Sequence, residues 1–185
     1  SLQEVLGAEN RTSEFDTYLD KYKSANPESD ALESIEFNAA KNLYFAQNYE
    51  QAIPKFEKFL VSYQKSSFAP DARYFLADSY LRMNRMQQGL QRMKEVITEN
   101  KSEYVNRGIQ RVADLEFDAK NYQEAIKYYS RLRDLASNRK EQQTALMGLM
   151  KSYFNINDYA GATRVANELI SQGNASLNAY NSALL

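Results

Sequence analysis

The side chains best equipped for chemistry in this chain are carboxylates and arginines, because the sequence has no histidine and no cysteine. Their absence removes thiol nucleophiles, disulfides, histidine general bases and the usual zinc ligands. Asp114, Glu116 and Asp118 superficially resemble a calcium loop, but no glycine follows, and in a helix Glu116 leaves the face that the two aspartates share. The sequence therefore predicts no catalytic centre, no cofactor and no metal site, and favours a non-catalytic binding function.

Two arginines are the strongest candidates for binding an anion. Arg107 and Arg111 stand one helical turn apart, so their guanidinium groups could grip a carboxylate in fork geometry. The alternative is that both side chains are solvated or paired with acids nearby. This choice depends on the helices that carry them.

Composition indicates a helical protein of 185 residues, long enough for one domain with a continuous core. Glycine and proline are scarce, whereas tyrosine and phenylalanine number 14 and 9. The net charge is −1 and both signs are interspersed, so no basic block predicts binding to nucleic acid or to anionic lipid. The apolar runs are too short to cross a bilayer.

Small residues recur at a nearly constant spacing, which indicates an internal repeat. One ladder has steps of 37, 36 and 37 residues, and it consists of Ala52, Gly89, Ala125 and Ala162. A second ladder lies 12 residues upstream and consists of Ala40, Ala77, Ala113 and Met150. Small residues in both helices of a pair let the axes approach to about 8–10 Å. Met150 breaks the pattern, so the fourth pair is expected to be wider or to rely on Ala162 and Ala166.

Helix starts also recur. Asn48, Asn121 and Asp158 are predicted N-caps, and Gln51 and Glu124 complete capping boxes with the two asparagines. The predicted helices are residues 30–46, 49–65, 70–84, 87–100, 103–119, 122–136, 140–155 and 159–172. Pro54 falls inside one of them, where it removes a backbone hydrogen bond and is expected to bend the helix.

These residues resemble the tetratricopeptide repeat, which has a small residue in its first helix, a Gly/Asn/Asp-Tyr turn and then an alanine four residues before an aromatic. The resemblance implies an all-α fold, an α-α superhelix of antiparallel helix pairs. The step of 36–37 residues resembles the envelope branch of the family, which includes TolA-binding proteins and outer-membrane assembly lipoproteins. The usual turn glycine is replaced at Gln47, Asn84, Lys120 and Asn157, and glutamine and lysine tolerate a left-handed turn poorly.

The resemblance implies four repeats within residues 30–172, at about 30–68, 69–102, 103–138 and 139–173. Tyr18, Leu19 and Tyr22 match Phe59, Leu60 and Tyr63 at an offset of 41, so residues 1–29 are expected to hold a partial repeat with its second helix at about 13–24. Residues 174–185 are expected to be the truncated first helix of a next repeat. We therefore expect an excerpt of a longer array.

In the tetratricopeptide family the first helices line a concave surface that binds ligands. Carried over by position, the partner-binding face would consist of Lys41, Tyr44, Tyr74, Asp78, Leu81, Arg107, Arg111, Asp114, Phe117, Met147, Lys151 and Phe154. The alternative is that the aromatics of this set only pack against neighbouring helices. Family members that clamp a C-terminal carboxylate use basic and asparagine residues, but the matching positions here carry Phe37, Lys41 and Phe75.

The sequence therefore favours a scaffold that binds a protein or peptide in its groove, in the bacterial periplasm or at the outer membrane if the envelope resemblance holds. The alternative compartment is the cytoplasm. The alternative functions are a structural spacer or self-association scaffold, including a homodimer through Leu184 and Leu185, and an accessory module of a larger enzyme or regulator.

Overall fold

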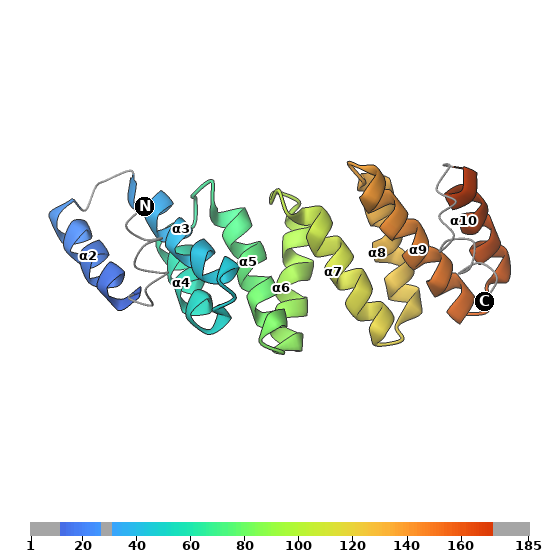
Figure 1. Cartoon of the computed structure of the whole chain (residues 1–185), viewed down its shortest axis with the longest axis horizontal. Coiled ribbons are helices and arrows are strands. Elements are labelled where there is room, and N and C mark those ends of the chain that lie inside the picture. Colours follow the sequence, from blue (N-terminus) through green and yellow to red (C-terminus); the bar gives the residue numbers. More distant parts are fainter. Residues whose placement is uncertain (1–11, 27–30, 172–185) are drawn as a thin grey trace. The chain divides into compact units, whose positions relative to one another are not determined.

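The computed structural model describes residues 12–26 and 31–171, and within these ranges it contains helices and no strand. The helices, labelled in Figure 1, are α2 (Thr12–Ala25), α3 (Ala31–Phe45), α4 (Tyr49–Ser62), α5 (Ala69–Arg82), α6 (Met86–Glu99), α7 (Val105–Asp118), α8 (Tyr122–Leu135), α9 (Arg139–Asn155) and α10 (Tyr159–Ser171). The all-α prediction is confirmed, and α3 to α10 begin and end within three residues of the expected positions. The expected helix at 174–185 lies outside the described residues.

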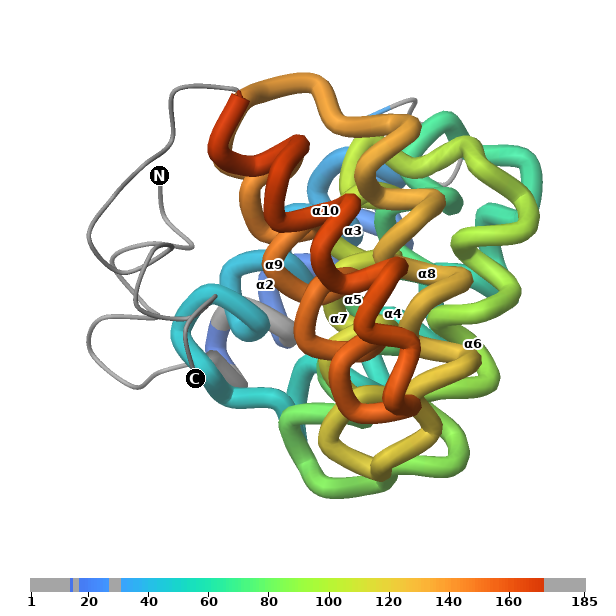
Figure 2. Tube along the Cα trace, turned by 90° about the vertical axis from the view of Figure 1, so that its right-hand side faces the viewer, coloured from blue at the N-terminus to red at the C-terminus, as the bar shows by residue number. Residues whose placement is uncertain are grey.

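The chain divides into two compact units, Ser1–Met93 and Lys94–Leu185, and the division falls inside α6. In the first unit α4 packs against both α3 and α5, and in the second unit α8 and α9 pack together and α9 packs against α10. Figures 1 and 2 both show α9 and α10 as an antiparallel pair. The candidate surfaces are accordingly described unit by unit.

Four hairpin turns share one backbone geometry. Gln47, Asn84, Lys120 and Asn157 have φ values of 61°, 58°, 63° and 61°. In the first turn the Asn48 N–H donates to the Leu43 carbonyl and the Gln47 N–H donates to the Tyr44 carbonyl, both at 2.9 Å. The other three turns repeat both bonds, which define a Schellman helix end. Glutamine and lysine therefore adopt the left-handed conformation that the sequence disfavours at these positions.

Side-chain caps follow the prediction in two of three places. The Asn48 side chain accepts from the Gln51 N–H at 3.4 Å, and Asp158 accepts from the Gly161 N–H at 2.8 Å. Asn121 makes no such cap, because its amide donates to a carboxylate oxygen of Glu116 at 3.0 Å. The predicted capping box at Asn121 is therefore wrong.

One N-cap, at the start of α9, was not predicted from the sequence. Asn138 accepts from the Glu141 N–H at 3.0 Å, and Glu141 in turn accepts from the Ser137 N–H at 3.0 Å and from the Asn106 amide at 2.9 Å. The hydrogen bond from the Ser137 backbone, supported by those from side chains, outweighs partial burial and holds the pKa of Glu141 below its usual value. This carboxylate ties α7 to the start of α9.

The small residues of both ladders are buried, as the repeat requires. Ala40, Ala52, Ala77, Ala113 and Ala125 are 0% exposed, and Met150 and Ala162 are 6% and 8% exposed. The first unit has an aromatic core in which Phe37 contacts the rings of Phe56, Phe59, Phe68 and Phe75. Pro54 is exposed, and α4 continues through it from Tyr49 to Ser62.

Candidate functional site

In the first unit, the expected binding residues lie largely in the interior. Tyr74, Asp78 and Leu81 are 7%, 3% and 3% exposed. Only Lys41 and Tyr44 are half-buried, and the Lys41 ammonium lies 5.5 Å from the centre of the Phe37 ring. The structure therefore gives these α5 residues a packing environment, and little of the expected face is accessible in this unit.

Asp78 shows why a charged residue is buried here. Its carboxylate accepts a hydrogen bond from the Tyr44 hydroxyl at 2.7 Å and one from the Arg82 guanidinium at 3.1 Å. Burial, together with the adjacent Asp78 carboxylate, raises the pKa of Tyr44 well above its usual value, so Tyr44 remains a donor. The family's binding positions, carried over to this sequence, placed Asp78 on the accessible face, and this placement is wrong.

In the second unit, five of the expected residues line one groove between α7, α8 and α9, which we call the α7–α9 groove. Its volume is about 540 Å³. The five are Arg111, Asp114, Phe117, Met147 and Lys151. Four further lining residues were not expected, namely Asp118, Tyr129, Thr144 and Gly148. The spacing of residues within a helix could have indicated two of them. Asp118 lies one turn after Asp114 on α7, and Thr144 lies one turn before Gly148 on α9.

The floor of the α7–α9 groove is held by Tyr129. Its hydroxyl donates to Asp114 at 2.7 Å, and burial together with that carboxylate raises the Tyr129 pKa well above its usual value. A Cβ built on Gly148 would lie 2.4 Å from the Tyr129 ring, so α9 approaches α8 this closely because residue 148 has no side chain. The groove thus combines the apolar side chains of Phe117 and Met147 with charges of both signs.

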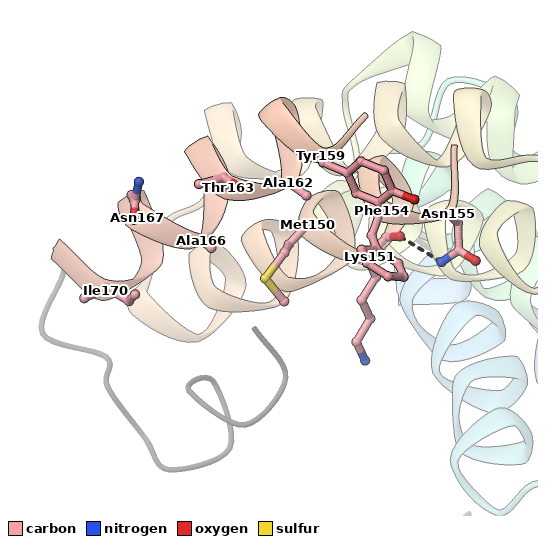
Figure 3. A pocket seen from close by; sticks show the side chains of 10 residues that line it. All are labelled: Met150, Lys151, Phe154, Asn155, Tyr159, Ala162, Thr163, Ala166, Asn167 and Ile170. Atoms are coloured by element: carbon pink, nitrogen blue, oxygen red, sulfur yellow. Dashed lines mark hydrogen bonds between the residues drawn. The ribbon is translucent and has the colours of Figure 1, made fainter. Parts of the chain in front are cut away.

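A second groove lies between α9 and α10, and we call it the α9–α10 groove. Its volume is about 390 Å³, and Lys151 borders it as well as the first groove. Figure 3 shows Met150 and Phe154 on α9 beside the side chains of α10, whereas the Lys151 side chain extends away from α10. Phe154 is 50% exposed, and its ring meets the Tyr159 ring edge-on at 5.6 Å.

The two arginines that could form a carboxylate clamp do not share a groove. Arg111 lines the α7–α9 groove, but Arg107 lines neither groove and is exposed, with its guanidinium 5.4 Å from the centre of the Tyr104 ring. Within residues 12–26 and 31–171, no cluster of three acidic side chains could hold a metal ion. Over the same ranges no helix has the length and apolar character needed to cross a membrane.

Comparison with known proteins finds a repeat family that part of the chain matches. Residues 37–100 match the tetratricopeptide repeat family model. Among curated proteins, none matches the chain in sequence. A tetratricopeptide repeat protein from Parabacteroides merdae is similar in structure, with a TM-score of 0.66 and 13% identity over 98% of this chain and 68% of that one.

Two further solved structures have the same fold. PilF of Pseudomonas aeruginosa has a TM-score of 0.63 and 16% identity, over 97% of this chain and 77% of that one. The tetratricopeptide-like repeats of a putative kinesin light chain from Podosopora anserina have a TM-score of 0.61 and 11% identity, over 92% and 90%. Residues 37–100 are therefore similar to tetratricopeptide repeats, and the chain shares the fold of these solved structures.

Proposed function

We propose that this chain is a non-catalytic interaction module that binds a peptide segment of a partner protein in the α7–α9 groove. The observation that supports the proposal is the convergence of Phe117 and Met147 with Arg111, Asp114 and Lys151 around one groove of about 540 Å³. An apolar strip beside fixed charges suits an amphipathic helix or an extended peptide. Phe117 and Met147 would bind the apolar side chains of the ligand, and the charges would set its direction.

The charges of the groove indicate what such a peptide carries. Lys151 is exposed, whereas Asp114 already accepts the Tyr129 hydroxyl. Lys151 therefore has more capacity for a ligand than Asp114 does. We expect an apolar peptide with at least one acidic residue, bound with a dissociation constant between micromolar and nanomolar.

The proposal can be tested by selecting peptides from a displayed library on the intact chain and measuring their affinity as synthetic peptides by fluorescence anisotropy. Lys151→Glu and Phe117→Ala should each weaken binding at least about tenfold, because each removes a contact of the groove. Lys127→Glu is the matched control, since Lys127 is exposed on α8 and pairs with Glu124. Circular dichroism should show that all three variants remain folded.

Retained affinity in both groove variants would move the binding site elsewhere. If no peptide is selected and the chain only self-associates, the spacer or scaffold function would replace the proposal. Circular dichroism separates both outcomes from misfolding, and Lys127→Glu shows whether a charge change outside the groove affects binding.

We further infer that the chain belongs to the envelope branch of the family, as an excerpt of a longer protein that works in the periplasm or at the outer membrane of a bacterium. Support comes from the repeat steps of 36 and 37 residues, which exceed the usual tetratricopeptide period of about 34. Fractionation of cells that express the tagged parent protein tests this proposal. Recovery in the cytoplasm would contradict it.

A further inference from the structure

Two opposite charges in the α7–α9 groove belong to side chains that the fold itself does not use. Asp118 on α7 and Lys151 on α9 both line the groove, and both are exposed. Neither side chain forms a hydrogen bond or an ion pair with any residue in the described part of the chain. Asp114, by contrast, accepts the Tyr129 hydroxyl at 2.7 Å. The charges of Asp118 and Lys151 therefore remain available to a ligand.

Asp118 occupies a position that is unfavourable for an anion in the unbound chain. It is the last residue of α7, and the C-terminal end of a helix carries a partial negative charge. The last turn of α7 contains no basic residue, and Lys120 in the following turn does not line the groove. Lys94 already pairs with Glu116. An acidic side chain at this helix end therefore lowers stability unless a cation from outside approaches it.

The charge of Asp118 acts on the groove. Burial and the Asp114 carboxylate raise the pKa of Tyr129 most, and the Asp118 carboxylate adds to the effect. Because Tyr129 forms the floor, the negative potential of Asp118 reaches the floor of the groove. On the other helix, Figure 3 shows the Lys151 side chain extending away from α10. The α7–α9 groove therefore presents an anion on one wall and a cation on the other.

The two charges lie at different levels along the groove. The helices α7 and α9 run in the same direction (Figure 1). Asp118 stands two residues before the corner residue Lys120, whereas Lys151 stands six residues before the corresponding corner residue Asn157. The difference is one helical turn, about 6 Å along the axis. A ligand that contacts both side chains must carry its cation nearer to the hairpin corners than its anion.

We propose that the α7–α9 groove selects a dipolar peptide segment, whose acidic side chain pairs with Lys151 and whose basic side chain pairs with Asp118. This inference rests on the proposed function, because it assigns the charge pattern of the peptide that binds there. A purely acidic peptide would be repelled by Asp118, and a purely basic one by Lys151. The offset between the two charges fixes the direction in which the peptide lies.

Charge exchange tests the proposal on a synthetic peptide selected against the intact chain from the displayed library. Asp118→Lys should weaken binding at least about fivefold, and replacing the basic residue of the peptide by glutamate should restore the affinity for this variant. Lys151→Glu should be rescued in the same way when the acidic residue of the peptide is replaced by lysine. Asp134→Lys is the matched control and should keep the natural affinity, since Asp134 is exposed in the last turn of α8, pairs with Arg133 and does not line the groove.

Thermal melts of the unbound chain distinguish recognition from a structural role. Asp118→Asn should raise the melting temperature, because it removes an anion from the C-terminal end of α7. The same change should weaken binding of the selected peptide about threefold, because the basic residue of the peptide loses its partner. A residue retained for stability would behave in the opposite way, so a fall in the melting temperature would overturn the proposal.

The remaining outcomes separate this inference from the proposed function. If Phe117→Ala weakens binding but charge exchange has no effect, the groove binds peptides without reading their charges, and this inference alone fails. It also fails if Asp118→Lys tightens binding, because the ligand is then purely anionic. If no peptide is selected, or if Phe117→Ala and Lys151→Glu both keep the full affinity, the proposed function fails and this inference fails with it.

Discussion

Tyrosine hydroxyls that donate to carboxylates on other helices recur throughout the described part of the chain. These pairs are Tyr44–Asp78, Tyr63–Glu36, Tyr80–Glu57 and Tyr129–Asp114. Burial and the neighbouring Glu36 carboxylate raise the pKa of Tyr63 to about 12, so the hydroxyl keeps its proton at neutral pH. Glu36 and Asp78 are buried, and there the pair lets a helix interface contain a carboxylate without leaving it unsatisfied.

Removing one of these hydroxyls should be costly where the acceptor is buried. Tyr44→Phe should lower the free energy of unfolding by about 1.5–3 kcal/mol, because it deprives a carboxylate that is 3% exposed of a donor. Urea denaturation monitored by circular dichroism gives the value. Tyr159→Phe is the control, since the Tyr159 hydroxyl donates only to an exposed side chain, Asn157, and its loss should cost less than about 0.5 kcal/mol. Equal effects of the two variants would contradict this account.

Backbone strain at the turns should be relieved by glycine. Lys120 has a φ of 63°, and its side chain is exposed. A left-handed conformation costs about 1–2 kcal/mol for a residue with a Cβ, whereas glycine in the unfolded chain has about 0.5–1 kcal/mol more entropy to lose. Lys120→Gly should therefore raise the free energy of unfolding by about 0.5–1 kcal/mol. Lys120→Ala, which keeps the strain, should give no gain in the same denaturation experiment.

At the scale of the helix, periodic small residues were sufficient to predict α3 to α10, because close packing constrains those positions in every repeat. Local polar contacts were less predictable. Asn121 and Asn48 occupy the same repeat position, but the side-chain amide of Asn121 donates a hydrogen bond to the Glu116 carboxylate and does not cap the helix. Asp78 and Asp114 also share a repeat position, yet Asp78 bonds to the preceding first helix and Asp114 to α8. The partner of Asn121 is five residues away, whereas the tyrosine partners of Asp78 and Asp114 are 34 and 15 residues away, so the repeat position alone does not determine the partner.

The α9 cap should make unit stability depend on pH. The folded pKa of Glu141 is below its unfolded value, so the unfolded state binds more protons in acid. The stabilisation is fully present above about pH 4.3, the ordinary pKa of glutamate, and it is lost as the pH falls through the folded pKa. Glu141→Gln should therefore lower the free energy of unfolding at pH 7 and flatten its decline in acid. Denaturant titrations from about pH 3 to about pH 7 measure both effects.

A control at the surface makes this result specific. Glu124 pairs with Lys127 at an exposed position, and such pairs contribute little. Glu124→Gln should therefore keep the acid slope of the natural chain. An unchanged slope in Glu141→Gln would exclude the cap as its source.

At the scale of the whole molecule, α6 contributes to both units. Within the second unit, Lys94 pairs with Glu116 at 2.8 Å, and Arg131 donates to the Ile97 carbonyl at 2.8 Å. Burial raises the pKa of Glu116, but the hydrogen bonds from Lys94 and Asn121 outweigh this effect and lower it. The second half of α6 therefore completes the second unit.

Truncation should expose this dependence. A fragment of residues 86–185 should unfold cooperatively, whereas residues 101–185 should be less stable by at least about 2 kcal/mol, because Glu116 loses its cation and the apolar contacts of α6 are lost. Thermal melts followed by circular dichroism compare the two fragments. Equal melting temperatures would show that α6 adds nothing to the second unit.

The four hairpin corners have a consequence for how such chains diverge. Two main-chain hydrogen bonds close each corner, and glutamine, asparagine and lysine all serve there. Selection that acts on backbone shape allows the side chains to drift, so the glycine signature disappears while the geometry persists. The family model matches residues 37–100 even though Gln47 and Asn84 stand at two of these corners, so the repeat remains recognisable without its turn glycine.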